Sequence, residues 1–234
     1  MTNNEILLDF INDFKPAKVN PLFRELSRGT LRPYEEHLPQ YTSAPFSDGY
    51  WHGAMQLTDE NELIVCSFMI HKELSERSGK KEQYNLAKKI LKDFQRYTGG
   101  FFIFYDTKGD FRFSLIYDIP GPDGKRYGNN FRRYTYFVSK EQTNKTFRTR
   151  LSEADFSYFE NIRDAFSVEK VTKAFYSELQ NWYFWAMNIV EFPDDEDKDK
   201  NSRNAKNLIR LITRIIFIWF MKEKRLIPSS LFEK

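Results

Sequence analysis

One short apolar run bounded by glycines constrains the fold of this chain more than any other feature. Residues Phe101–Tyr105 directly follow Gly99 and Gly100. A continuous apolar run of this length is too short for a buried helix, so it predicts a strand covered on both faces. The polar residues after it include Gly109, where a hairpin loop usually needs a positive φ. Apolar and polar residues then alternate over Phe111–Ile119, which is typical of a strand with one wetter face. We therefore expect this hairpin at the centre of a mixed sheet.

Hydrophobic periodicity places further elements before and after this hairpin. We expect a helix at residues 3–14, followed by strands at residues 51–57 and 62–70. An amphipathic, lysine-rich helix is expected at residues 79–97, and a last strand at residues 134–138. Prolines punctuate residues 16–45, which predicts an ordered wrap without long regular structure. These elements together predict an α/β domain built on a mixed β-sheet with flanking helices. A restriction-endonuclease-like core is one arrangement that fits this order.

The pattern becomes helical after residue 140. Ser152 with Asp155 resembles a capping box that opens a helix to residue 166, and Ser167 can cap a long helix after it. Apolar residues return at helical spacing over residues 202–225, where Arg203 belongs to a wetter stripe. We therefore expect the α/β domain to cover residues 1–145 and a helical segment to cover residues 146–234.

Composition limits the environment in which this chain works. The 234 residues carry a net charge of +3, so only local clusters of charge argue for nucleic acid. The single cysteine, Cys66, excludes an internal disulfide and a cysteine-rich zinc site, which favours the reducing cytoplasm. The N-terminus lacks the pattern of a signal peptide, and the most apolar segment, Leu208–Met221, is too short and too charged to cross a bilayer. We expect no membrane association.

Motifs of familiar enzyme classes do not occur in this sequence. Its three histidines, His37, His52 and His71, are far apart and lack metal-ligand spacing. There is no nucleophile elbow, Walker loop or Rossmann glycine fingerprint. These observations predict no metal site and argue against a metabolic enzyme.

A restriction-type nuclease needs an acid near one strand end and an Asp/Glu-x-Lys triplet on the neighbouring strand, where the carboxylates hold Mg²⁺. In the expected strand at residues 62–70, no acid follows the first residue and there is no lysine, so this strand offers no such triplet. The weak candidates lie in two turns and are Asp59, Glu62, Asp106 and Lys108. They could converge only if both turns lie at the same end of the sheet. The alternative is that they are ordinary solvated turn residues.

Two groups of basic residues could contact phosphate. Cations at a helix N-terminus are unfavourable unless an anion binds there. The N-terminus of the expected amphipathic helix is nevertheless rich in basic residues. The alternative is that nearby glutamates neutralise them. The second group mixes arginines with aromatic residues around the last strand of the sheet, which suits nucleic acid but is also common on exposed strands. The candidate phosphate-binding residues are Arg77, Ser78, Lys80, Lys81, Arg132 and Arg133.

Four helical segments in the last third of the chain carry a resemblance to a known protein family. These segments are Ala165–Lys173, Phe175–Leu179, Leu208–Arg214 and Phe217–Lys224. They are similar to a region of large, single-chain restriction–modification proteins of type IIG. The resemblance implies that these helices precede an adenine-specific DNA methyltransferase domain that uses S-adenosylmethionine. It also implies that the preceding α/β region carries, or has lost, a Mg-dependent nuclease domain.

The chain departs from this family in two respects. It has no Asn-Pro-Pro-Tyr/Phe motif and no glycine-rich cofactor loop, so it cannot methylate DNA by itself. We therefore expect a piece of a longer protein, in which this part is an accessory domain that contacts DNA or the methyltransferase core without catalysis. The alternatives are a divergent Mg-dependent endonuclease and a structural or protein-interaction domain. The apolar helix at residues 202–225 is expected to pack on its neighbouring helix or on a second copy, giving a homodimer.

Overall fold

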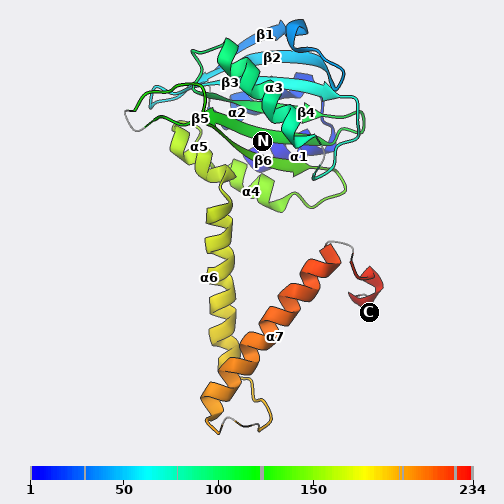
Figure 1. The fold of residues 1–234 in the computed structure, drawn as a ribbon, viewed down its shortest axis with the longest axis vertical. Helices are drawn as coiled ribbons and strands as arrows, with labels where there is room; N and C mark the ends of the chain where they lie inside the picture. Colours follow the sequence, from blue (N-terminus) through cyan, green and yellow to red (C-terminus); the bar gives the residue numbers. More distant parts are fainter. Residues whose placement is uncertain are drawn as a thin grey trace. The chain divides into compact units, whose positions relative to one another are not determined.

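The computed structural model describes residues 2–28, 30–77, 79–121, 124–194, 196, 198–223 and 226–232. The chain forms two compact units, residues 1–167 and residues 168–234. The first unit is an α/β domain and the second is helical (Figure 1). Among the described residues, no helix is long and apolar enough to cross a membrane.

A six-stranded mixed sheet forms the centre of the first unit, as the sequence predicts (Figure 1). The strands lie in chain order and are β1 (Leu31–His37), β2 (Phe46–Gln56), β3 (Glu62–Ile70), β4 (Gly99–Tyr105), β5 (Phe111–Asp118) and β6 (Phe131–Val138). Neighbours are antiparallel except β3 and β4, which are parallel. The parallel pair needs a crossover, and α3 (Lys80–Asp93) supplies it.

Helices cover both faces of this sheet. One core includes side chains from α1 (Asn3–Asn12), α2 (Val19–Leu26), α4 (Lys145–Glu153) and α5 (Phe159–Phe166). The other core lies under α3 and the short 3₁₀ helix η2 (Pro39–Tyr41). Successive residues of β4 enter the two cores alternately, so the prediction of a strand covered on both faces is confirmed.

The predicted β4–β5 hairpin is confirmed, but the prediction that one face of β5 is wetter than the other is wrong. Gly109 has the predicted positive φ of +83° in the β4–β5 loop. Arg112, Ser114 and Asp118 are nevertheless buried, because each finds a polar partner under the neighbouring elements. Ser114, for example, shares a hydrogen bond of 2.8 Å with the Thr135 hydroxyl of β6. The polar residues that alternate with apolar ones along β5 are therefore buried with hydrogen-bond partners and are not exposed to solvent.

The proline-rich segment holds more regular structure than its composition predicts. It contains the 3₁₀ helix η1 (Pro16–Lys18), α2 and β1. Pro21 occupies the first turn of α2, where a backbone N–H has no partner within the helix. Pro33 lies in the edge strand β1, beside a register shift between Pro33 and Glu36. Prolines at these positions cost little, so they do not interrupt the fold.

The predicted capping box at Ser152 is also wrong. Ser152 lies near the end of α4, where its hydroxyl donates to the Thr149 carbonyl. Phe147 and Leu151 of α4 and Phe166 of α5 enter the sheet core. These contacts extend the first unit to Ser167.

The second unit consists of α6 (Val168–Met187), α7 (Lys200–Glu223) and a 3₁₀ turn, η3 (Ser229–Phe232). The Asn204 side chain joins the interhelical loop to α7, since it bonds the Phe192 N–H at 3.1 Å and the Val190 carbonyl at 3.0 Å. Arg203 is only 6% exposed and pairs with Asp194 at 2.8 Å, so its predicted place on a wetter stripe is wrong. Many large apolar side chains of both helices remain exposed, among them Trp182, Trp185, Phe217 and Trp219.

Candidate nucleic-acid interface

The α3 helix presents a row of cations along the side that contacts β6. The neighbouring face of the helix is buried on the sheet through residues that include Ala87 and Ile90. Lys80, Tyr84, Lys88 and Lys92 are four residues apart and therefore share one side of the helix. The Tyr84 hydroxyl donates to the Phe131 carbonyl of β6 at 2.7 Å. A helix rises about 1.5 Å per residue, so Lys80 to Lys92 covers about 18 Å.

The structure brings residues of the two predicted basic groups together at this seam. Arg133 of β6 donates through Nη1 to the Lys80 carbonyl, and its guanidinium lies 5.4 Å from the centre of the Tyr84 ring. Arg132 directly precedes Arg133 in the chain but faces the opposite side of the sheet, beside Tyr117. Strand alternation therefore separates the two arginines that the sequence analysis grouped.

We call the cations on this side of the sheet the basic seam. It consists of three lysines of α3, one arginine of β6 and one arginine of the loop before β6: Lys80, Lys88, Lys92, Arg133 and Arg126. Small cavities lie at its two ends.

The first cavity lies at the N-terminus of α3. It has a volume of 260 Å³ and is lined by Glu76, Lys80, Arg112, Thr135 and Gln142, among others. Arg112 is fully buried and donates to the Gln83 Oε1 and to the Ser75 carbonyl, both at 2.6 Å. The residue that precedes the helix, Gly79, provides no side-chain cap.

Cations crowd one another around this cavity. Burial, with nearby Arg133, lowers the pKa of Arg112 to about 10. Burial lowers the pKa of Lys80 as well, with Arg112 and Arg133 adding to the effect and outweighing the opposing influence of Glu76. The pKa of Arg133 is lowered by burial. A site in which positive charges are both desolvated and close together favours a bound anion.

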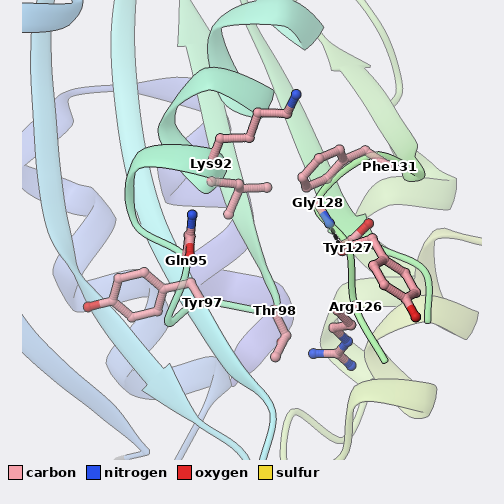
Figure 2. Close-up of a pocket in the computed structure, with 10 residues that line it drawn as sticks. Lys92, Gln95, Tyr97, Thr98, Arg126, Tyr127, Gly128 and Phe131 are labelled. Atoms are coloured by element: carbon pink, nitrogen blue, oxygen red, sulfur yellow. Dashed lines mark hydrogen bonds between the residues drawn. The ribbon is translucent and has the colours of Figure 1, made fainter. Parts of the chain in front are cut away.

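The second cavity, of 390 Å³, lies at the other end of α3. Figure 2 shows Lys92 and Gln95 on one side of it and Arg126, Tyr127 and Phe131 on the other. The Arg126 guanidinium donates to the Asn61 side-chain oxygen at 2.8 Å. Aromatic rings next to cations are the combination on which single-stranded nucleic acids stack.

The carboxylate of Asp118 holds the wall of this second cavity in place. It accepts from the Gly128 N–H at 2.8 Å and from the Asn130 N–H at 3.3 Å. Burial lowers the pKa of Arg126, while Asp118 and Asp59 act in the opposite direction. The loop that carries Arg126 is therefore tied to the end of β5.

The other predicted phosphate-binding residues lie outside the seam. Arg77 and Lys81 are exposed near the start of α3, and Ser78 lies outside the described residues. Among the described residues, none forms an ion pair with Arg77, Lys80, Lys81 or Arg133. Glu73, one of the glutamates expected to neutralise them, pairs with Lys108 at 2.9 Å instead.

The four weak nuclease candidates do not converge. Leu63 of β3 is paired with Gly99 of β4, and Met69 with Tyr105, so the two strands run side by side in the same direction. The turn with Asp59 precedes β3 and the turn with Asp106 follows β4, which places these turns at opposite ends of the sheet. At about 3.3 Å per strand residue, they are about 20 Å apart.

Each of these candidates instead has a local structural role. The buried Asp106 carboxylate accepts from three backbone N–H groups, of Leu74 at 2.8 Å, Lys108 at 3.0 Å and Asp110 at 3.1 Å. Asp59 accepts from the Phe159 N–H at 2.9 Å, at the start of α5. Glu62 forms a two-pronged ion pair with Arg96 at 2.5 and 3.0 Å. Within the described part of the chain, no group of three or more His, Cys, Asp or Glu residues is placed to hold a metal ion.

One buried polar pair was missed by the sequence analysis. The His52 Nε2 and the Ser67 Oγ are 2.7 Å apart between β2 and β3. Both residues are buried, and burial lowers the pKa of His52 to about 4. A serine inside the apolar run of β3 was the available signal, because a buried hydroxyl needs a partner.

Comparison of this chain with protein-family models, with curated proteins and with solved structures found no significant match.

Proposed function

We propose that the first unit binds the sugar–phosphate backbone of DNA along the basic seam. The observation that carries this proposal is the alignment of Lys80, Lys88 and Lys92 on one side of α3, with Arg133 beside them. At about 1.5 Å of rise per residue, Lys88 and Lys92 are separated by about 6 Å along the helix axis, and Lys80 and Lys88 by about 12 Å. This row offers repeated positive charge to a polyanion, which is the main source of affinity for nucleic acid.

In this proposal the chain is the accessory, non-catalytic part of a restriction–modification methyltransferase. The resemblance of Leu208–Arg214 and its neighbours to type IIG proteins supports that context. Methyl transfer from S-adenosylmethionine, and any Mg-dependent cleavage, then belong to other parts of a longer protein. The location we propose is the cytoplasm, where such proteins meet DNA.

A divergent nuclease is the second candidate function. The order of helix, antiparallel strands, crossover helix and parallel strand accommodates a restriction-type core, which supports this alternative. The distance between the Asp59 and Asp106 turns opposes it, since metal-assisted hydrolysis needs converging carboxylates. We therefore rank DNA binding without cleavage first.

Fluorescence anisotropy with a labelled duplex at low salt tests the first proposal. The double variant K88E/K92E reverses two charges of the seam and should weaken binding strongly. The matched control is R132E/K145E, which makes the same change in net charge at two exposed residues on the other side of the sheet. Equal losses in the two variants, or no complex with the unaltered chain, would contradict a role for the seam.

A further inference from the structure

We propose that a 530 Å³ cavity at the start of α3 binds a small organic acid, with the carboxylate at the helix N-terminus and the apolar body against the end of the sheet. The buried walls of this cavity are apolar and include Phe46, Ile70 and Leu74, while Gly79 and Gln83 line its polar end. Small-molecule sites in proteins have volumes of about 300–1,000 Å³, so the cavity is large enough for such a ligand. The site is separate from the basic seam, and nucleic acid has no part in this inference.

The cavity lies where α/β proteins commonly bind small molecules. It is at the C-terminal end of β3, the strand that runs parallel to β4 and precedes the crossover helix α3. In open α/β sheets, ligands bind outside the carboxyl ends of the strands. Two buried side chains fix the wall here, since the Asp106 carboxylate accepts from the Leu74 N–H at 2.8 Å and Arg112 donates to the Ser75 carbonyl at 2.6 Å. The wall is therefore formed before any ligand arrives.

A buried amide without a partner indicates what the ligand must supply. Gln83 is 1% exposed, and its Nε2 has no hydrogen-bond partner among the described residues, although most buried donors in proteins have one. The Gln83 Oε1 accepts from Arg112 at 2.6 Å, which fixes the orientation of the amide. The Nε2 is directed toward Gly79, where a Cβ would be only 3.1 Å from it, and both residues line the cavity. The cavity thus presents a donor that needs an acceptor from a ligand.

Two sources of positive potential favour a carboxylate over a neutral acceptor. The first is the N-terminus of α3, which carries a partial positive charge and has no side-chain cap at Gly79. The second is Arg112, which donates to the oxygen of the Gln83 amide. A charged donor on this oxygen polarises the amide, so the N–H on its other side becomes a stronger donor. Both sources act on the same end of the cavity.

The exposed residues of the cavity have mixed charge and do not decide between these two kinds of ligand. They are His71, Lys72, Glu73 and Glu82. Glu73 and Glu82 oppose an anion, but Glu73 pairs with Lys108 at 2.9 Å, and charges at exposed positions are screened by water and salt. The apolar walls favour an organic acid over an inorganic anion, because only the organic acid covers them with apolar surface.

Calorimetric titration of the full chain with 3-phenylpropionate and with 3-phenylpropanamide tests this site. The two probes share an apolar body and a carbonyl oxygen, and they differ in charge. Gln83→Glu keeps an oxygen for Arg112 and replaces the free donor with a negatively charged oxygen. Gln56→Glu is the matched control, because it makes the same change at an exposed residue at the other end of β2, about 30 Å from Phe46.

We expect the unaltered chain to bind the acid about fivefold or more tightly than the amide, because a charge-assisted hydrogen bond is stronger than a neutral one. Gln83→Glu should lower the affinity for the acid about tenfold or more through repulsion. It should also reverse the preference, since the amide probe can donate its own N–H to the new carboxylate. Gln56→Glu should change either affinity about twofold at most. Circular dichroism checks that each variant is folded.

Three results overturn this inference: no binding of either probe by the unaltered chain, no preference for the acid, or equal losses in the two variants. If Gln83→Glu does not fold, the comparison of the two probes on the unaltered chain still supports or rejects the site. Because no nucleic acid enters these titrations, failure of this site is distinguishable from failure of the proposed function.

Discussion

Arg132 and Arg133 are adjacent in β6 but face opposite sides of the sheet, and this makes them a sharp test of the basic seam. Arg133 contacts Lys80 and Tyr84 on the α3 side, whereas Arg132 lies beside Tyr117 on the other side. The substitutions R133A and R132A remove the same charge at consecutive positions. Only R133A should change the salt dependence of DNA binding.

The expected size of the effect follows from counting contacts. If each of the five seam cations neutralises one phosphate, log affinity falls with log salt concentration with a slope of about −4.5. Between 50 and 200 mM salt this corresponds to a loss of affinity of about 500-fold. R133A leaves four contacts, so its slope should be about −3.6 and its loss about 150-fold. R132A should keep the original slope.

Fluorescence anisotropy with one duplex at three or four salt concentrations measures these slopes. Thermal unfolding of both variants serves as the control, because Arg133 is partly buried and its loss could disturb α3. An unchanged slope for R133A, or the same reduction for R132A, would refute the assignment of DNA binding to the α3 side of the sheet.

Four further predictions concern the remaining features of the chain. Asp106→Ala should lower the free energy of unfolding by about 3 kcal/mol, because three backbone N–H groups lose a charged acceptor; an unchanged urea midpoint would contradict that role. Burial holds the pKa of His52 near 4 against an ordinary 6.5, so the unfolded chain takes up a proton between these values while the folded chain does not. The free energy of unfolding should therefore fall by about 3 kcal/mol as the pH falls from 7 to 4, and His52→Gln should flatten this dependence in urea titrations. Supercoiled plasmid incubated with the chain and Mg²⁺ or Mn²⁺ should stay intact, and nicking abolished by Asp59→Ala or Asp106→Ala would reverse our ranking of DNA binding over cleavage. The apolar groove between α6 and α7 should drive association of two copies, so I212E/I216E should lower the mass found by light scattering; an unaltered monomeric mass in both proteins would exclude the dimer.

Local sequence patterns predicted those elements whose structure is determined by residues close together in the sequence. The apolar run at Phe101–Tyr105, the turn at Gly109 and the lysine-rich helix α3 were found in this way. The elements α2 and β1 were missed because prolines were interpreted as breaks, although Pro21 and Pro33 occupy positions that need no N–H donor. Propensity cannot show this, since it depends on which strand becomes the edge of the sheet.

The sequence identified individual residues of the candidate site but not the contacts between them. Lys80 and Arg133 were both identified as basic, but their contact joins residues 53 positions apart and depends on how α3 lies on β6. Arg112 was expected on a wet face, because alternation does not distinguish an exposed arginine from a buried one with partners. The separation of Asp59 from Asp106 follows from the parallel pairing of β3 and β4, which no local pattern reveals.

The register shift in β1 bears on how this sheet behaves at high protein concentration. An outermost strand offers unpaired N–H and C=O groups, with which a strand of another molecule can pair and begin to aggregate. In β1, Pro33 removes one donor, the shift between Pro33 and Glu36 bends the strand, and Arg32, Glu35 and Glu36 add charge. These features close that border of the sheet to intermolecular pairing. Growth of the sheet by addition of a strand is therefore confined to the opposite border, along β6.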